Sequence, residues 1–104
     1  MRKENHSYVK NAADAEQVKE AGRKVQDRRK QELDDIREIT SSVAGRRFMW
    51  RLLEHCKVFE SIWEPSAKIH HNAGRQDVGH FLMAEVVAAD EAVLLKMMSE
   101  AKNG

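Results

Sequence analysis

The chain has 104 residues, of which 34% are charged, 41% hydrophobic and only 6% aromatic. This length suits a small protein with a modest core, and the composition favours helices with solvated faces over a β-sandwich or barrel. The single cysteine excludes an internal disulfide. No apolar run is long enough to predict a membrane span, and residues 1–10 lack the apolar centre of a signal peptide, so we expect a protein made in a cytosol.

Charge is unevenly distributed along the chain. Residues 1–30 hold nine Lys/Arg against five Asp/Glu, a net charge of +4, whereas residues 31–104 hold nine against twelve, a net charge of −3. A basic N-terminal segment joined to a mildly acidic remainder predicts contact with an acidic partner. The alternative is a solvated helix whose excess charge meets no partner.

A long helix is predicted from Ala12, with Asn11 as its N-cap, to about Thr40, because no proline interrupts this stretch. Residues 1–10 show no periodicity and are predicted to fray. The second half of the helix carries large apolar residues at spacings of three and four, namely Leu33, Ile36, Ile39 and Val43. We therefore expect the C-terminal half of this helix to pack on the rest of the chain.

The front half of this helix is the predicted partner-binding element. Its apolar seam, defined as Val18, Ala21, Gly22 and Val25, is narrow and suits a neighbouring helix from a sister copy or from another protein. Isolated helices of this kind are marginal in water, so a stable helix here requires outside contacts. The residues assigned to partner binding belong to the seam or flank it: Val18, Gly22, Arg23, Lys24, Val25, Arg28 and Arg29.

The basic residues of this segment raise a second hypothesis, association with nucleic acid. Lys19, Arg23 and Lys30 recur at helical spacing, as do Lys24 and Arg28, and such rows can follow a phosphate backbone. Against this, no aromatic residue lies among them for base stacking. Three acidic residues also interleave with them and can form pairs within the helix: Glu16, Glu20 and Asp27.

Residues 41–104 are predicted to form a compact three-helix body, and residues 1–40 a separate basic arm with the long helix. Pro65 breaks the apolar pattern between the first two body helices. The three helices are expected over residues 43–57, over 73–89 after the N-cap Asn72, and over 91–101 after the N-cap Asp90. The expected fold class is therefore all-α, a long N-terminal helix plus a compact three-helix body.

Apolar residues at helical spacing predict the core of this body. On its first helix, two neighbouring strips are apolar: one contains Phe48, Leu52 and Phe59, and the other contains Met49, Leu53 and Cys56. Gly79 is expected to permit a close approach of two helices. The residues predicted to be buried are Phe48, Leu52, Leu53, Leu82 and Val86.

Three arginines and a tryptophan form a second group of candidate site residues. Arg46, Arg47 and Arg75 follow glycines at predicted helix starts, where a cation is poorly placed for the helix dipole. We therefore expect each to have a specific partner, either a carboxylate on another chain or an internal one such as Glu54, Glu60, Asp77 or Glu85. Trp50 lies off the main apolar stripe and is expected to cover the helix edge or to pack on the first helix. These four residues, Arg46, Arg47, Trp50 and Arg75, are assigned to ion pairing or docking.

A cluster of potential metal ligands falls within 26 positions: His55, Cys56, His70, His71 and His80. Neither C-x-x-C nor H-x-x-x-H occurs, and adjacent helical residues point about 100° apart, so we expect no metal site and no cofactor. Cys56 is expected to pack as a small apolar residue. Phosphate-binding loops and a marked pair of catalytic carboxylates are absent from the sequence, which predicts no enzymatic activity.

Three consecutive segments resemble a known family. They are GRRFMWRLLEHCKVFESIW (45–63), NAGRQDVGHFLMAEVVAAD (72–90) and EAVLLKMMSEA (91–101). They are similar to small proteins of tailed bacteriophages, encoded in the virion structural gene cluster, mostly of short-tailed phages. That family has a Gly-Arg-Arg-Phe-hydrophobic-Trp-Arg helix, then an Asn-x-Gly-Arg-Arg/Gln-x-hydrophobic-Gly helix and a terminal helix containing Tyr/Leu-x-x-Met. Lys57 stands where the family pattern has a turn glycine.

The resemblance covers about residues 41–101 and implies a virion protein without enzymatic activity. From it we expect a structural protein, made in the host cytoplasm, that docks in several copies on the portal, the tail or the genome-ejection machinery. The expected partners are its own copies and other virion proteins (portal, tail or internal proteins), with DNA as a further contact for the basic arm. Two alternatives stay open: a nucleic-acid-associated protein and a coiled-coil adaptor unrelated to phages.

Overall fold

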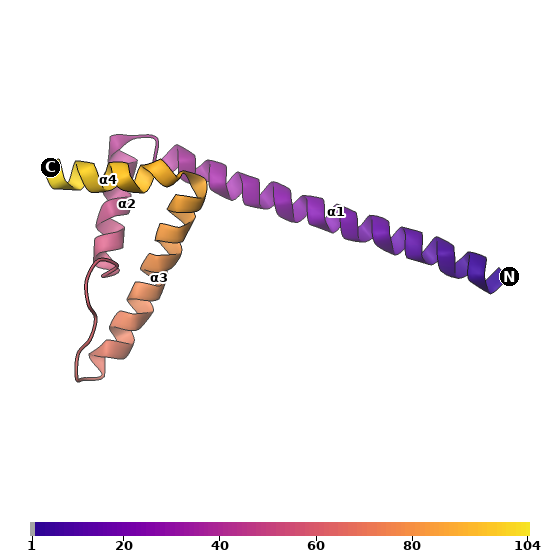
Figure 1. Cartoon of the computed structure of the whole chain (residues 1–104), viewed down its shortest axis with the longest axis horizontal. Helices are drawn as coiled ribbons and strands as arrows, with labels where there is room; N and C mark the ends of the chain where they lie inside the picture. The colour runs from indigo at the N-terminus through magenta and orange to yellow at the C-terminus, as the bar shows by residue number, and fades with distance from the viewer. Residues whose placement is uncertain (1) are drawn as a thin grey trace. The chain divides into compact units, whose positions relative to one another are not determined.

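The computed structural model describes the backbone of residues 2–104 and the side chains of residues 11–104. Within this part of the chain there are four helices and no strands (Figure 1). The helices are α1 (Arg2–Ile39), α2 (Val43–His55), α3 (Lys68–Ala89) and α4 (Glu91–Asn103). The predicted all-α fold, with a long N-terminal helix followed by three shorter helices, is therefore confirmed.

The start of α1 differs from the prediction. The helix begins at Arg2, so Asn11 lies inside it and is not its N-cap. The physical reason is that residues 2–11 contain neither proline nor glycine, so nothing in this stretch terminates a helix. An asparagine inside a helix is tolerated when, like Asn11, it is exposed to solvent.

Contacts within the chain define two compact units, residues 1–32, called the arm below, and residues 33–104, called the body. The last turns of α1 therefore belong to the body. There, Ile36 packs against the core, as its apolar spacing predicts. Arg37 ties the same turns to the end of α3, because its Nε donates to the carbonyl oxygen of Ala89 at 2.6 Å.

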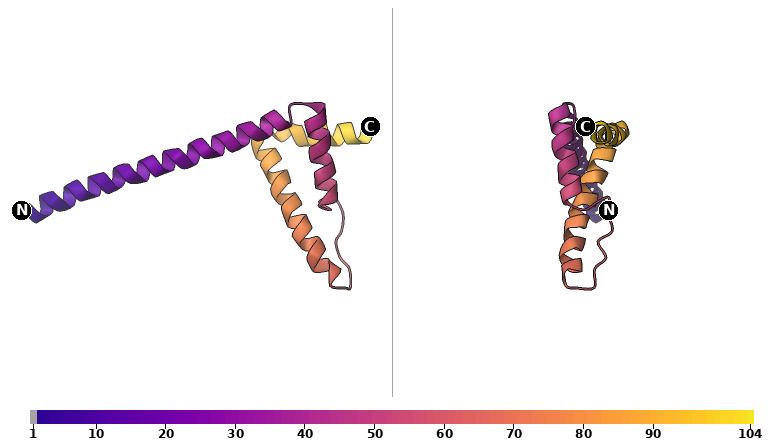
Figure 2. Two further views of the ribbon diagram at one scale, coloured as in Figure 1. Left: turned by 180° about the vertical axis from the view of Figure 1, so that it is seen from behind. Right: turned by 90° about the vertical axis from the view of Figure 1, so that its left-hand side faces the viewer.

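In the body, α2 and α3 run side by side in opposite directions, and α4 crosses one side of both (Figures 1 and 2). The core forms where the three helices meet. It consists of Met49 and Leu53 from α2, Val86 from α3 and Met97 from α4, and the last three are at most 1% exposed. Around it lie partly buried side chains: Ile36, Trp50, Val58, Leu82, Met83, Val93 and Leu94.

The prediction of buried residues is confirmed for Leu53 and Val86 and wrong for Phe48, which is 60% exposed. Leu52 and Leu82 are only partly buried. The reason is that α2 turns just one of its two apolar strips inward, the strip with Met49, Leu53 and Cys56. Phe48 and Leu52 precede the buried residues by one position and so lie about 100° further round the helix.

Side-chain caps set the starts of α2 and α4. The backbone N–H of Gly45 donates to Ser42 Oγ at 3.0 Å, and that of Ala92 donates to Asp90 Oδ1 at 3.0 Å, which confirms Asp90 as an N-cap. The predicted cap at Asn72 is wrong, because α3 begins five residues earlier than expected, at Lys68. Residues 68–72 contain no helix breaker, so α3 extends back toward Pro65.

The turn after α2 contains a lysine in the left-handed conformation. Lys57 has φ of 59°, the only positive φ of a non-glycine residue in the described chain. Its N–H donates to the carbonyl of Glu54 at 2.9 Å, and the N–H of Val58 donates to that of Leu53 at 3.3 Å. These two bonds form a Schellman motif, whose left-handed position glycine normally occupies.

We predict that Lys57→Gly raises the free energy of unfolding by about 1 kcal/mol, because glycine relieves the clash between Cβ and the backbone in this conformation. Urea titration followed by circular dichroism measures the change. Lys57→Ala is the matched control. It removes the same exposed Lys57–Glu60 ion pair, 3.9 Å long, but keeps the Cβ atom, so it should give no gain. Equal effects of glycine and alanine would contradict this explanation.

Gly79 allows the close approach that the sequence predicts. A Cβ atom at this position would lie 2.7 Å from Cys56 Cβ and would overlap Val58 Cγ2. The segment that approaches α3 is thus the turn at the end of α2. Cys56 packs there as a buried, apolar side chain.

Candidate docking surfaces

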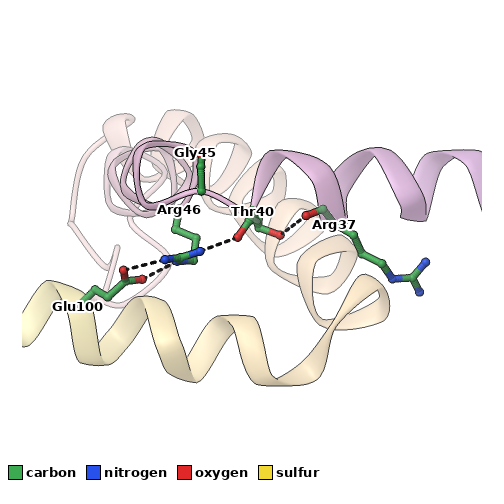
Figure 3. A network of polar contacts seen from close by, with 6 residues as sticks. Arg37, Thr40, Gly45, Arg46 and Glu100 are labelled. Carbon is green, nitrogen blue, oxygen red and sulfur yellow. Dashed lines mark hydrogen bonds and ion pairs between the residues drawn. The ribbon is translucent and has the colours of Figure 1, made fainter.

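Arg46 is an internal residue of the body. Its side chain is 6% exposed and makes three hydrogen bonds. Nε and Nη2 donate to the two carboxylate oxygens of Glu100 at 2.7 and 3.1 Å, and Nη1 donates to the carbonyl of Thr40 at 3.0 Å (Figure 3). Because Thr40 follows the last turn of α1, the cation lies at the negative end of that helix.

The ion pair of Arg46 joins the end of α1, the first turn of α2 and the last turns of α4. The sequence leaves an internal carboxylate and one on another chain open as the partner of Arg46. The structure shows an internal one, Glu100, which is not among the four residues named as examples. The hydrogen bond from Arg46 lowers the pKa of the Glu100 carboxyl, and the bond to Glu100 raises the pKa of Arg46. Arg46 is therefore a structural residue and does not belong to an exposed docking surface.

This pairing predicts a specific loss of stability in acid. Since the folded-state pKa of Glu100 is below its ordinary value of 4.5, the pair stabilises the fold above pH 4.5 and loses its effect as the pH falls through the lowered pKa. Glu100→Gln should therefore be less stable than the wild type at pH 7, and the difference should shrink as the pH falls below 4.5. Chemical denaturation across this range measures it, with Glu54→Gln, an exposed carboxylate of α2, as control. A difference that stays constant with pH would contradict the prediction.

Arg75 and Gln76 hold the end of α2. Arg75 Nη2 donates to the carbonyl of His55 at 2.8 Å, and Gln76 Nε2 donates to the carbonyls of Lys57 and Glu60 at 2.8 and 3.1 Å. These carbonyls belong to the last residue of α2 and to the turn that follows it, where helix geometry leaves acceptors available to side chains. The partner of Arg75 is thus a backbone oxygen, and none of the predicted carboxylates.

Trp50 and Arg47 line a groove between α2 and α4. The Trp50 ring stacks on Phe59, with 4.8 Å between the ring centroids and 22° between the planes, so Trp50 covers one edge of α2. Arg47 is exposed. The groove has a volume of about 520 Å³ and is lined by Val43, Arg46, Arg47, Trp50, Met97, Ser99, Glu100, Ala101, Asn103 and Gly104. Of the four residues assigned to ion pairing or docking, Arg47 and Trp50 therefore remain accessible to a partner.

The arm presents the seam to solvent. Val18 is 71% exposed and Val25 66% exposed, and a Cβ atom added to Gly22 would meet no atom within 4 Å. Two of the flanking cations pair within α1, Arg23 with Glu20 at 3.3 Å and Arg29 with Glu32 at 3.4 Å. The other flanking residues, Lys24 and Arg28, are also exposed. All seven residues assigned to partner binding thus lie along one helix, with the seam open to a partner.

A second apolar surface, which the sequence did not predict, lies on the body. We call it the α2–α3 face and define it by Phe48, Leu52, Val78, Phe81 and Leu82. Phe48, Val78 and Phe81 are 60%, 53% and 62% exposed. The signal in the sequence was the presence of two apolar strips on α2, more than a body of this size can bury.

Among the side chains that the structure describes, no three His, Cys, Asp or Glu residues come together in a group able to hold a metal ion. The helices of the described chain contain no stretch that is long and apolar enough to span a membrane.

A protein-family model described as Bbp19-like phage protein matches residues 36–99. This range covers most of the body, including both arginine-containing motifs, and begins inside the last turns of α1. No curated protein and no solved structure matches the chain.

Proposed function

Because the chain belongs to the Bbp19-like phage protein family, we propose that it is a non-enzymatic structural protein of the virion. In this proposal it docks in several copies on the portal, the tail or the genome-ejection machinery, and the arm is the docking element. The proposal is consistent with membership of a phage protein family and with the resemblance of the body segments to small virion proteins. Its partners are its own copies and other virion proteins.

The exposed arm is the observation that carries this proposal. Every described residue from 11 to 32 is exposed, apart from the partly buried Arg29. A helix of this length without packing is marginally stable in water, and tertiary or intermolecular contacts normally stabilise such a helix. The apolar side chains of the seam pack on nothing within the arm, so a partner can cover them. The basic side chains around the seam favour an acidic partner.

Incorporation into virions tests the proposal. Val18→Glu/Val25→Glu places two charges in the seam and should reduce the amount of the protein in purified virions by about tenfold or more, as measured by quantitative mass spectrometry. A chain that lacks residues 1–30 should behave in the same way. The matched control is Ala12→Glu/Ala13→Glu, which adds the same charges to exposed arm positions that point away from the seam.

Wild-type incorporation of both the seam variant and the truncated chain would contradict docking through the arm. A wild-type protein that is absent from purified virions would contradict the structural role itself. Cryo-electron microscopy of the portal vertex should show ordered, symmetric copies of the body.

Association with DNA is the second candidate function. The observation in its favour is the row of exposed cations on the arm, which includes Lys24 and Arg28. Such binding would weaken steeply with salt, because each neutralised phosphate releases counterions. Lys24→Gln/Arg28→Gln should then reduce both the affinity for duplex DNA and its salt dependence. If the wild-type chain shows no salt-sensitive binding to DNA at micromolar concentration, this alternative is wrong.

A further inference from the structure

The α2–α3 face is an apolar surface with no covering helix in the body. Trp50 follows Met49 by one position and lines the groove between α2 and α4, which shows on which side of α2 helix α4 lies. Phe48 precedes Met49 by one position and so points about 100° to the opposite side. Because α2 and α3 are antiparallel, the residues that precede the buried positions of α3, such as Val78 before Gly79, lie on that same side.

Figure 2 shows this side directly. In its left view, from behind, α2 and α3 lie toward the viewer and α4 passes behind α2. Two exposed phenylalanines and an exposed valine on one side of two packed helices form the kind of apolar patch that marks a protein–protein contact. The patch lies outside the groove between α2 and α4 and shares no residue with the arm.

We propose that the α2–α3 face binds the arm of a second copy of this chain through the seam. The inference rests on the proposed function in that it names the partner of the arm, and it adds a second site that the sequence did not predict. Each chain then carries one donor surface, the seam, and one acceptor surface, the α2–α3 face.

Charge complementarity supports this choice of partner. Residues 1–30 carry a net charge of +4 and residues 31–104 a net charge of −3, so the arm of one copy is attracted to the body of another and repelled by another arm. On α3, the acidic residues Asp77 and Glu85 flank Val78 and Phe81. Their negative charge favours the cations beside a docked seam, such as Arg28.

The dimensions of the two surfaces also agree. The seam runs over eight residues, from Val18 to Val25, which is about 10 Å along the helix axis. Phe48 to Leu52 on α2 and Val78 to Leu82 on α3 each cover about 6 Å, so a seam laid between them contacts each helix along about one turn. The open position at Gly22 lets an aromatic ring of the face approach the arm backbone closely.

This contact joins two different surfaces, so each bound copy still offers a free seam at one end and a free face at the other. Association of this head-to-tail kind continues until a ring closes or a filament forms. The expected behaviour of the purified full-length chain is therefore a concentration-dependent series of oligomers.

Mixing two complementary variants tests the inference. Val18→Glu/Val25→Glu disables the seam and Phe48→Glu/Phe81→Glu disables the face, and each variant alone should be monomeric in analytical ultracentrifugation at concentrations where the wild type associates. Mixed in equal amounts, they should form a heterodimer that grows no further, because only one intact seam and one intact face are present. Its affinity should match that of the wild-type contact, at least tenfold above that of either variant with itself.

Controls distinguish this contact from the alternatives. Ala12→Glu/Ala13→Glu on the arm and Leu95→Glu, at a 69% exposed position of α4, should associate like the wild type. Circular dichroism should show that all variants keep their helices, and Phe81→Ser is a milder face variant that should weaken association without added charge. If the contact paired face with face, the seam variant would still associate with itself, and if it paired arm with arm, the face variant would do so. Either result would overturn the inference.

Two further results would also overturn it: a wild-type chain that stays monomeric at several hundred micromolar, and a face variant that associates as strongly as the wild type. The proposed function is judged separately by virion incorporation. If the seam variant is excluded from virions while the face variant is incorporated normally and no heterodimer forms, the arm docks on another virion protein and only the present inference fails.

Discussion

Leu53→Ala is expected to lower the free energy of unfolding by about 2–5 kcal/mol, which is the usual cost of removing a large aliphatic side chain from a packed core. Leu53 is fully buried and lies among Met49, Val86 and Met97, so the truncated side chain leaves a cavity between three helices. A body of this size has a small net stability, and the variant should be partly unfolded at 37 °C.

Phe48→Ala is the comparison that makes this prediction specific to the buried strip. Phe48 is the larger side chain but is 60% exposed, so its removal should change the free energy of unfolding by no more than about 0.5 kcal/mol. Urea titration at low protein concentration, where copies do not associate, measures both variants. If Phe48→Ala costs as much as Leu53→Ala, the face that α2 turns to the core has been misassigned.

The same pair of residues shows how far the sequence predicts the fold. Spacings of three and four residues reveal the helices, because they depend on a periodicity that holds along each element by itself. Both apolar strips of α2 satisfy that periodicity, and the positions of α3 and α4 decide which one is buried. Those positions follow from packing among all three helices, so Leu53 was predicted correctly and Phe48 was not.

The arginine-containing motifs show a similar limit at the candidate sites. A cation in the first turn of a helix predicts that a partner exists, but not that Arg46 meets Glu100, 54 residues away. Arg75 pairs with a backbone carbonyl of α2, and no residue type in a sequence signals such an acceptor. By contrast, the exposed seam could be predicted, because a helix segment with only two large apolar residues cannot form a core.

These contacts also explain what the two motifs do. In Gly-Arg-Arg-Phe, the glycine and the first arginine shape the corner between α1 and α2, whereas the second arginine and the phenylalanine, Arg47 and Phe48, point to solvent. In Asn-x-Gly-Arg-Gln, Arg75 and Gln76 hold the turn after α2. The motifs therefore preserve the body, which in turn fixes the positions of the exposed side chains on the α2–α3 face.

Gly45→Ala is expected to lower the free energy of unfolding by about 1–2 kcal/mol. A Cβ atom at Gly45 would overlap the backbone carbonyl of Ile39, and a backbone oxygen cannot swing aside as a flexible side chain can. The corner between α1 and α2 must shift, which also disturbs the bond between Arg46 and Thr40 at the same corner. Overpacking of this kind typically costs about 1–3 kcal/mol and here outweighs the gain of about 1 kcal/mol in helix propensity.

Gly74→Ala is the control for this prediction, because it should change the free energy of unfolding in the opposite direction. Gly74 lies within α3, and a Cβ atom there would meet nothing within 4 Å, so alanine should stabilise the body by up to about 1 kcal/mol through helix propensity alone. Thermal unfolding followed by circular dichroism should therefore show a lower Tm for Gly45→Ala and a higher Tm for Gly74→Ala. If both variants shift Tm upward, the corner accommodates a side chain, and Gly45 is not required for the approach of α1 to α2.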